Sequence, residues 1–207
     1  MLKYVIYIIV AAVVISLVLG TIHLIRVKLK NKKEMSGYGG AKIEVTKNFG
    51  KVLIVYYSKS GNTRDIAERI KAKTNADIYE IKITEEMPSG PKFYMNMKKQ
   101  LKTGKYPEIE KNLPNFEKYD LIFVGAPVWW YTVATPVLSF LEIADFKEKQ
   151  VVPFSTQGSN YGTFFEDFAA KAKNARILKG ADFNNLHGKY GDALDNKIAV
   201  WLNGLEQ

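Results

Sequence analysis

Residues 4–25 form a long, predominantly apolar run that contains no Asp, Glu, Lys or Arg, with Ser16, Thr21 and His23 as its clearly polar residues. As an α-helix, a run of this length extends about 33 Å, slightly more than the roughly 30 Å hydrocarbon core of a bilayer. A helix is also the arrangement in which a single segment satisfies all of its own backbone amides inside lipid. The sequence therefore predicts one transmembrane helix over residues 4–25.

Basic residues are concentrated directly after this run. Residues 1–50 carry eight Lys or Arg and two Asp or Glu, whereas residues 51–207 carry 22 and 19. The positive-inside rule, applied to the cluster from Arg26 to Lys33, predicts a single-pass protein of the cell membrane with its C-terminal domain on the cytoplasmic side. Such a cluster suits a lipid headgroup surface, and we expect no nucleic-acid binding.

A cleaved signal peptide is the alternative to a permanent anchor. Val18-Leu19-Gly20 resembles a weak cleavage site, although the apolar run is long for a signal peptide and the basic cluster follows it instead of preceding it. Residues 26–50 continue as a basic juxtamembrane segment and then as a largely polar stretch. We predict that they form a flexible linker to a domain over residues 51–207.

Short β-branched and aromatic runs alternate with segments of helical spacing along this domain. The predicted strands span residues 51–57, 77–83, 119–126, 149–155 and 175–180, and the predicted helices span residues 63–72, 91–103, 136–144, 164–173 and 192–205. The alternation is typical of an α/β fold with a five-stranded, doubly wound parallel sheet between two layers of helices. In the lysine-rich helix at 91–103, we expect Tyr94, Met97 and Leu101 to point inward.

Ligands of such sheets bind beyond the carboxyl ends of the strands, which makes the loops after the first, third and fourth strands the candidate site. The first of these loops, residues 58–63, is SKSGNT. Its hydroxyls, its glycine and the free amides of a helix start predict a phosphate nest made by Ser58, Ser60, Gly61, Asn62 and Thr63. The loop lacks GxxxxGK[ST] and GxGxxG, so we expect a monophosphate. Taken alone, the loop also fits an ordinary capped turn.

Three adjacent aromatic residues stand in the loop after the third strand. Residues 125–132 read GAPVWWYT, and the candidate ligand contacts are Pro127, Val128, Trp129, Trp130 and Tyr131. Large planar side chains at a ligand-binding edge suit stacking on a flat ring. The alternative is that these rings pack on a neighbouring surface loop.

The loop after the fourth strand is rich in small and polar residues. Residues 155–162 read STQGSNYG, and the candidate contacts are Ser155, Thr156, Gln157, Gly158, Tyr161 and Gly162. Glycines permit a close approach of the backbone to a ligand. By itself this loop also fits a plain flexible turn.

The sequence has no cysteine, which excludes disulfides and thiolate chemistry. It shows no cluster with metal-ligand spacing, and we predict neither a metal site nor a catalytic side chain. His187 is interpreted as a surface residue. Redox chemistry in such a chain needs an added organic cofactor.

Residues 54–70, IVYYSKSGNTRDIAERI, resemble the flavodoxin signature, with Ser58, Gly61, Thr63 and Ala67 at its hydroxyl, small-residue, threonine and alanine positions. The loop at 125–132 and the segment after it resemble the flavin-ring loop and following helix of the same family. The resemblance covers about residues 51–205. It implies a strand order of 2-1-3-4-5 and non-covalent binding of FMN, with the phosphate on the first loop and the isoalloxazine ring between the other two.

The resemblance implies electron transfer, with a redox partner protein or NAD(P)H and a quinone as partners, and the predicted anchor places this activity at a membrane. Flavodoxins are typically strongly acidic, whereas residues 51–207 carry a small basic excess. This departure keeps open a flavin-dependent NAD(P)H:quinone-type reductase, or a flavodoxin-like haem-pathway oxidase, so the chain is either an electron carrier or an enzyme. A cofactor-free, membrane-anchored interaction domain is the alternative from another class.

Overall fold

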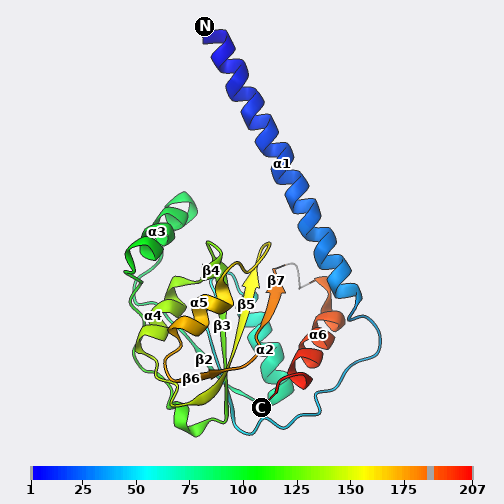
Figure 1. Cartoon of the computed structure of the whole chain (residues 1–207), viewed down its shortest axis with the longest axis vertical. Coiled ribbons are helices and arrows are strands. Elements are labelled where there is room, and N and C mark those ends of the chain that lie inside the picture. Colours follow the sequence, from blue (N-terminus) through cyan, green and yellow to red (C-terminus); the bar gives the residue numbers. More distant parts are fainter. Residues whose placement is uncertain (1, 186–188, 207) are drawn as a thin grey trace.

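The computed structural model describes residues 2–185 and 189–206, so the interpretation of His187 lies outside the described residues. Its first helix, α1 (Leu2–Ser36), projects from a domain in which strands and helices alternate (Figure 1). The helix is long and apolar enough to cross a membrane, and its most apolar stretch is not buried against the rest of the chain. By length and composition it contains the helix predicted over residues 4–25.

The parallel sheet has the strand order β2-β1-β3-β5-β6. These strands are β1 (Val52–Tyr56), β2 (Asp77–Glu80), β3 (Leu121–Trp129), β5 (Lys149–Gln157) and β6 (Ala175–Ile177). The predicted α/β class and the predicted order 2-1-3-4-5 are confirmed, because these are the five parallel segments taken in chain order.

Two further short strands bring the sheet to seven. β7 (Ala181–Asn184) pairs with the second half of β5, and β4 (Thr132–Val133) folds back antiparallel onto the end of β3. Of the strand predicted at 175–180, only residues 175–177 form a strand, β6, and β7 begins just after the predicted end. The break between β6 and β7 falls beside Pro153, which has no N–H to donate and lies between the part of β5 that pairs with β6 and the part that pairs with β7.

Helices cover both faces of the sheet. One face carries α2 (Asn62–Thr74) and α6 (Gly191–Asn203), the other carries α4 (Thr135–Ile143) and α5 (Phe164–Lys171), and a short 3-10 helix, η1 (Phe116–Lys118), precedes β3. Side chains that alternate along β1 supply both cores. Leu53 and Val55 pack with the α4–α5 side, whereas Ile54 and Tyr56 pack with the α2–α6 side.

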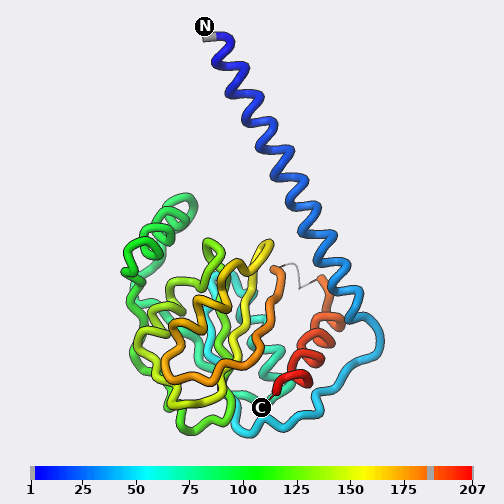
Figure 2. Tube along the Cα trace, viewed as in Figure 1, coloured from blue at the N-terminus to red at the C-terminus, as the bar shows by residue number. Residues whose placement is uncertain are grey.

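The segment that joins α1 to the domain differs from the predicted flexible linker. α1 continues to Ser36, and Met35 is 3% exposed within the α2–α6 core. The chain then returns along α6 to β1 (Figure 2), where the Asn196 amide donates to the carbonyls of Tyr38 and Ala41 and accepts from the N–H of Ile43. The polar segment predicted to be a tether is therefore held against α6, whose side chains hydrogen-bond its backbone.

The remaining helix, α3 (Gly90–Thr103), stands at the end of the domain toward which the parallel strands point (Figure 1). Phe93 and Met97 are its buried residues, whereas Tyr94 is 59% exposed. The inward position predicted for Tyr94 is therefore wrong, and the neighbouring Phe93 is the buried residue. Two adjacent aromatic residues do not show from the sequence which of them faces the core. Phe93 contacts the Trp129 ring, whereas more than half of Tyr94 is accessible to solvent.

Candidate functional site

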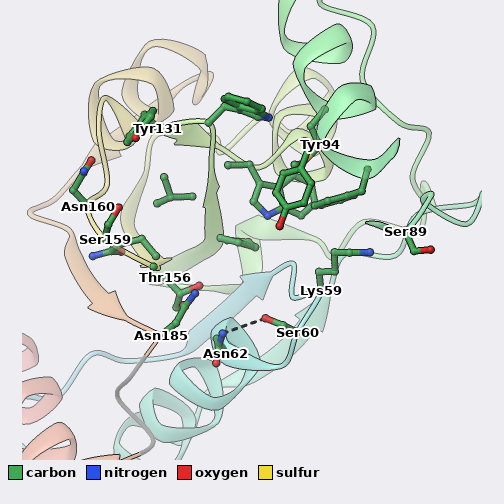
Figure 3. A pocket seen from close by; sticks show the side chains of 18 of the residues that line it. Lys59, Ser60, Asn62, Ser89, Tyr94, Tyr131, Thr156, Ser159, Asn160 and Asn185 are labelled. Atoms are coloured by element: carbon green, nitrogen blue, oxygen red, sulfur yellow. Dashed lines mark hydrogen bonds between the residues drawn. The ribbon is translucent and has the colours of Figure 1, made fainter. Parts of the chain in front are cut away.

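A cavity of about 820 Å³ lies at the carboxyl ends of β3 and β5, between their loops, the loop after β1 and helix α3 (Figure 3). Its volume falls in the range typical of small-molecule and cofactor sites. It is lined by Lys59, Ser60, Asn62, Ser89, Gly90, Phe93, Tyr94, Met97, Pro127, Val128, Trp129, Trp130, Tyr131, Thr156, Gln157, Gly158, Ser159, Asn160 and Asn185. One side of this cavity is polar and the other is aromatic.

The polar wall is the loop between β1 and α2. Ser60 and Asn62 line the cavity, and the Asn62 amide donates to the Ser60 hydroxyl over 3.1 Å (Figure 3). Gly61 between them takes φ +89° as the N-cap of α2, and its N–H donates to the Ser58 hydroxyl. No side chain among the described residues caps the N-terminus of α2. The first amides of that helix therefore remain free to bind an anion.

The start of α2 is tied to the sheet by a pair of threonines. Thr63 and Thr156 are 1% and 2% exposed, and their hydroxyl oxygens are 2.8 Å apart. Thr156 also lines the cavity, whereas Thr63 does not. The Thr63 hydroxyl thus positions the polar loop against β5 and is already engaged in a hydrogen bond.

Two basic residues lie at the polar loop, and only one of them, Lys59, points into the cavity. The Arg64 guanidinium bonds Glu80 over 2.6 Å, and this hydrogen bond raises the pKa of Arg64 above its ordinary value. Arg64 is therefore turned toward β2. Lys59 instead lines the cavity, with its ammonium 4.5 Å from the centre of the Phe93 ring. Lys59 therefore places a positive charge at the border of the cavity, close in sequence to the free amides at the start of α2.

The aromatic wall begins with Trp129 at the end of β3. Its indole meets the rings of Tyr57 and Phe93 edge to face, with centroids 5.7 and 5.0 Å away. Burial raises the pKa of Tyr57 to about 12, so this phenol stays neutral near neutral pH. The wall therefore rests on a network of three rings from three parts of the chain.

The next two residues form the turn of the β3–β4 hairpin. Trp130 and Tyr131 have φ angles of +52° and +65°, and Trp129 pairs with Thr132 on either side of them. A two-residue turn with both φ angles positive favours Asn and Gly, so these rings occupy a strained backbone. Trp130 is 46% exposed and Tyr131 is 59% exposed. The turn thus holds two large rings at the mouth of the cavity at the cost of an unfavourable backbone conformation.

The loop after β5 supports that hairpin from behind. Gly162 has φ +57°, and a Cβ at this position would overlap the Tyr131 carbonyl oxygen. The neighbouring Thr163 N–H donates to the same oxygen over 2.8 Å. Glycine is required at 162 because the two backbones approach too closely for a side chain.

The structure separates the predicted site residues into two groups. Ten of them line the cavity: Ser60, Asn62, Pro127, Val128, Trp129, Trp130, Tyr131, Thr156, Gln157 and Gly158. Six lie beside it: Ser58, Gly61, Thr63, Ser155, Tyr161 and Gly162. Within this second group, Ser155 is fully buried with its hydroxyl on Gln157, and Tyr161 packs against Phe165.

Sequence reasoning missed the contribution of α3. Its first two turns supply Gly90, Phe93, Tyr94 and Met97 to the cavity, and Ser89 just before the helix also lines it. The one signal in the sequence was the presence of aromatic residues in a helix otherwise dominated by lysine. Nothing in their spacing shows that they face a cavity built by distant strands.

The fold and the cavity define a doubly wound domain that binds a small molecule at the carboxyl edge of its sheet. A family model described as flavodoxin matches residues 51–203. The chain therefore belongs to the flavodoxin family. No curated protein matches it.

Solved structures give the same picture. A Lactobacillus acidophilus flavoprotein in complex with FMN is 26% identical, with a TM-score of 0.59, and the match covers 68% of this chain and 98% of that one. The NMR structure of the apo form of the flavoprotein from the same organism is 27% identical, with a TM-score of 0.52, over 73% and 99% of the two chains. A Bacteroides uniformis protein, provisionally described as a flavoprotein, is 23% identical with a TM-score of 0.60 over 74% and 98%, which supports the fold.

Proposed function

We propose that this chain is a membrane-anchored flavodoxin-like protein that binds FMN non-covalently and transfers electrons. The observation that carries the proposal is the meeting, in one cavity, of an uncapped helix N-terminus and an exposed aromatic hairpin. The first suits a phosphate and the second suits a flat ring system. FMN joins these two chemical groups in one molecule.

The polar wall fits the phosphate. Ser60 and Asn62 offer a hydroxyl and an amide at the start of α2, where the helix dipole and free N–H groups favour an anion. Lys59 adds a positive charge at the border of the same cavity. The pairing of Thr63 with Thr156 holds this loop in place before the cofactor binds.

The aromatic wall fits the ring. Trp129, Trp130 and Tyr131 line the cavity on one side, and Gln157 and Gly158 line it from the end of β5. Bound FMN supplies the capacity to accept and donate electrons. The protein's rings exclude water from its faces, and the backbone and amide groups at 157–158 can hydrogen-bond its polar edge.

The anchor rests on α1. Its apolar stretch has a mean hydropathy of 2.9 and is exposed, and the basic residues from Arg26 to Lys33 follow it. Exposed apolar surface of this extent is stable in a bilayer and unfavourable in water. The charge distribution supports a location in the cell membrane with the domain on the cytoplasmic side.

The electron donor and acceptor belong to one of two classes. A redox partner protein suits an electron carrier, whereas NAD(P)H with a quinone suits a reductase. The small basic excess of residues 51–207 favours keeping the reductase as the second candidate. Oxidation of NADH or NADPH by the FMN-loaded protein with an added quinone would identify the reductase, and its absence would identify the carrier.

A comparison of FMN with riboflavin tests the cofactor assignment. Both carry the same ring, but only FMN carries a phosphate, so the full-length protein in detergent should bind FMN at least about tenfold more tightly. Quenching of flavin fluorescence measures both affinities. Equal affinity for the two ligands, or no binding of either, would overturn the proposal.

Ser60→Asp locates the phosphate on the polar wall. The new carboxylate should weaken FMN binding by about tenfold or more through repulsion and leave riboflavin binding nearly unchanged. Ser89→Asp is the matched control, because it adds the same charge to the cavity border at the start of α3. If the two variants lower FMN affinity equally, the phosphate is not held at the start of α2.

A further inference from the structure

The cavity opens at the end of the domain from which α1 leaves. Figure 1 shows the strands β5 and β7 pointing toward this end, with α3 rising beside them and α1 projecting away in the same direction. Figure 2 shows the same arrangement along the Cα trace. If α1 crosses a bilayer, this end of the domain faces the bilayer and the opposite end faces away from it.

This orientation is held by packing and does not depend on a free hinge. The last turns of α1 contact α6, where Asn31 and Met35 are 4% and 3% exposed. The Lys197 ammonium, 8% exposed as a residue, bonds Glu34 over 2.5 Å and the Asp182 carbonyl over 2.6 Å. Because α1 is continuous from residue 2 to residue 36, its membrane segment and its docked segment share one axis.

The exposed face of α3 has the composition of a membrane-surface helix. The helix contains four lysines and no acidic residue, and Lys92, Lys98, Lys99 and Lys102 are all exposed. Met95 is 73% exposed at the N-terminal half of the same helix. The acidic residues closest in sequence precede the helix, in the loop from β2. Lysines attract anionic headgroups, and an apolar side chain between them can enter the interfacial region.

The aromatic hairpin continues this face toward the centre of the cavity mouth. The Lys98 ammonium lies 5.5 Å from the centre of the Trp130 ring, so α3 and the hairpin meet. Trp130, Tyr131 and Tyr94 are between 46% and 59% exposed. Trp and Tyr with one side in apolar surroundings and the other in water are the side chains enriched at membrane interfaces.

We propose that this cavity rim, made of Tyr94, Met95, Trp130, Tyr131 and the lysines of α3, docks on the anionic surface of the bilayer that α1 crosses. The proposal rests on the proposed membrane anchoring. Charge complementarity selects the lipid, since the face carries several lysines and α3 itself has no carboxylate. The rim and the basic cluster after the apolar run of α1 then contact one headgroup layer, and the cavity mouth opens at the membrane surface.

The chain has no cysteine, so single-cysteine labelling is clean. We would place a nitroxide on full-length protein at Met95→Cys on the rim, at Ser16→Cys in the middle of the apolar run, and at Glu117→Cys at the amino end of β3. Nanodiscs of phosphatidylcholine are compared with nanodiscs that also contain phosphatidylglycerol. The readout is the collision of each label with lipid-dissolved oxygen and with an aqueous nickel chelate.

We expect the Met95 label to lose severalfold of its collision rate with the chelate when phosphatidylglycerol is present, and the Glu117 label to stay fully accessible. K98Q/K99Q/K102Q should abolish the protection of the Met95 label. K71Q/K118Q/K173Q removes the same charge from exposed lysines away from the rim and should retain it.

The Ser16 label separates the two proposals. A Ser16 label open to the chelate overturns the anchor itself. A Ser16 label in lipid, with the Met95 label equally accessible in both kinds of nanodisc, overturns the docked rim and leaves the anchor standing. Equal protection of the Met95 and Glu117 labels also overturns the docked rim, because it shows that the domain does not contact the membrane through the rim alone.

Discussion

The two walls of the cavity use different parts of the chain for the same ligand. The polar wall acts through backbone amides at the start of α2, and its side chains are small and held by hydrogen bonds. The aromatic wall acts through large rings, and its backbone at Trp130 and Tyr131 is strained. Truncating a side chain should therefore weaken ligand binding most at the aromatic wall. Both walls should lose stability when the contacts that hold their backbone are removed.

The largest effect is expected from Gly162→Ala, which attacks the backbone support of the aromatic wall. The new Cβ would overlap the Tyr131 carbonyl oxygen, and the alanine would have to adopt the left-handed φ that Gly162 has. We expect a loss of about 2–4 kcal/mol in the free energy of unfolding. Thermal unfolding in detergent measures it. Gly158→Ala is the control, since its Cβ would meet nothing within 4 Å; equal losses in the two variants would contradict the close-approach argument.

Thr63→Val tests the support of the polar wall. It leaves the buried Thr156 hydroxyl without its partner, and we expect a loss of about 1–3 kcal/mol in the free energy of unfolding. The double variant T63V/T156V should be more stable than the sum of the single losses predicts, by about 1 kcal/mol. Denaturation of all three variants measures this coupling.

Thr74→Val is the matched control in the same helix. Its hydroxyl bonds only the Ile70 carbonyl one turn earlier among the contacts described, so its loss should stay below about 0.5 kcal/mol. Additive losses at Thr63 and Thr156 would show that the two hydroxyls do not support each other.

Trp130→Ala separates binding from stability on the aromatic wall. Because the ring is half exposed, the free energy of unfolding should change little, while FMN affinity should fall by about 5- to 30-fold through lost stacking. Flavin fluorescence titration gives the affinity. Tyr161→Ala, outside the cavity, should leave the affinity unchanged. A larger effect at Tyr161 than at Trp130 would reverse the assignment of the wall.

The smallest effect concerns Tyr57, which follows β1 and contacts Trp129, so it joins the two walls. Its pKa is raised from 10 to about 12 by burial, so the folded state favours the neutral phenol. The stability from this term is complete below pH 10 and is lost as the pH rises from 10 toward 12. Tyr57→Phe should remove this part of the alkaline decline, seen in unfolding measurements against pH. An identical alkaline loss of stability in both proteins would show that ionisation of Tyr57 does not cause it.

Features that are local in the sequence were predictable. The strand, polar turn and helix at 51–72 follow from an apolar run, small turn residues and helical spacing, each within one segment. The five parallel strands and their order were predicted, and the polar and aromatic loops both reach the cavity. The errors concern rotation and contact. Tyr94 is more than half exposed where an inward position was predicted, and residues 38–43 are bound to α6 where a flexible linker was predicted.

The sequence alone determined the class of fold, the apolar helix and the chemistry of the loops, because hydrophobic periodicity and turn composition act over a few residues. The tertiary structure decided that α3 forms a wall of the cavity, that Gly162 must stay small, and that α1 leaves toward the cavity mouth. Each of these depends on a contact between segments far apart in the chain. Such contacts are set by packing of whole elements, which no short stretch of residues encodes.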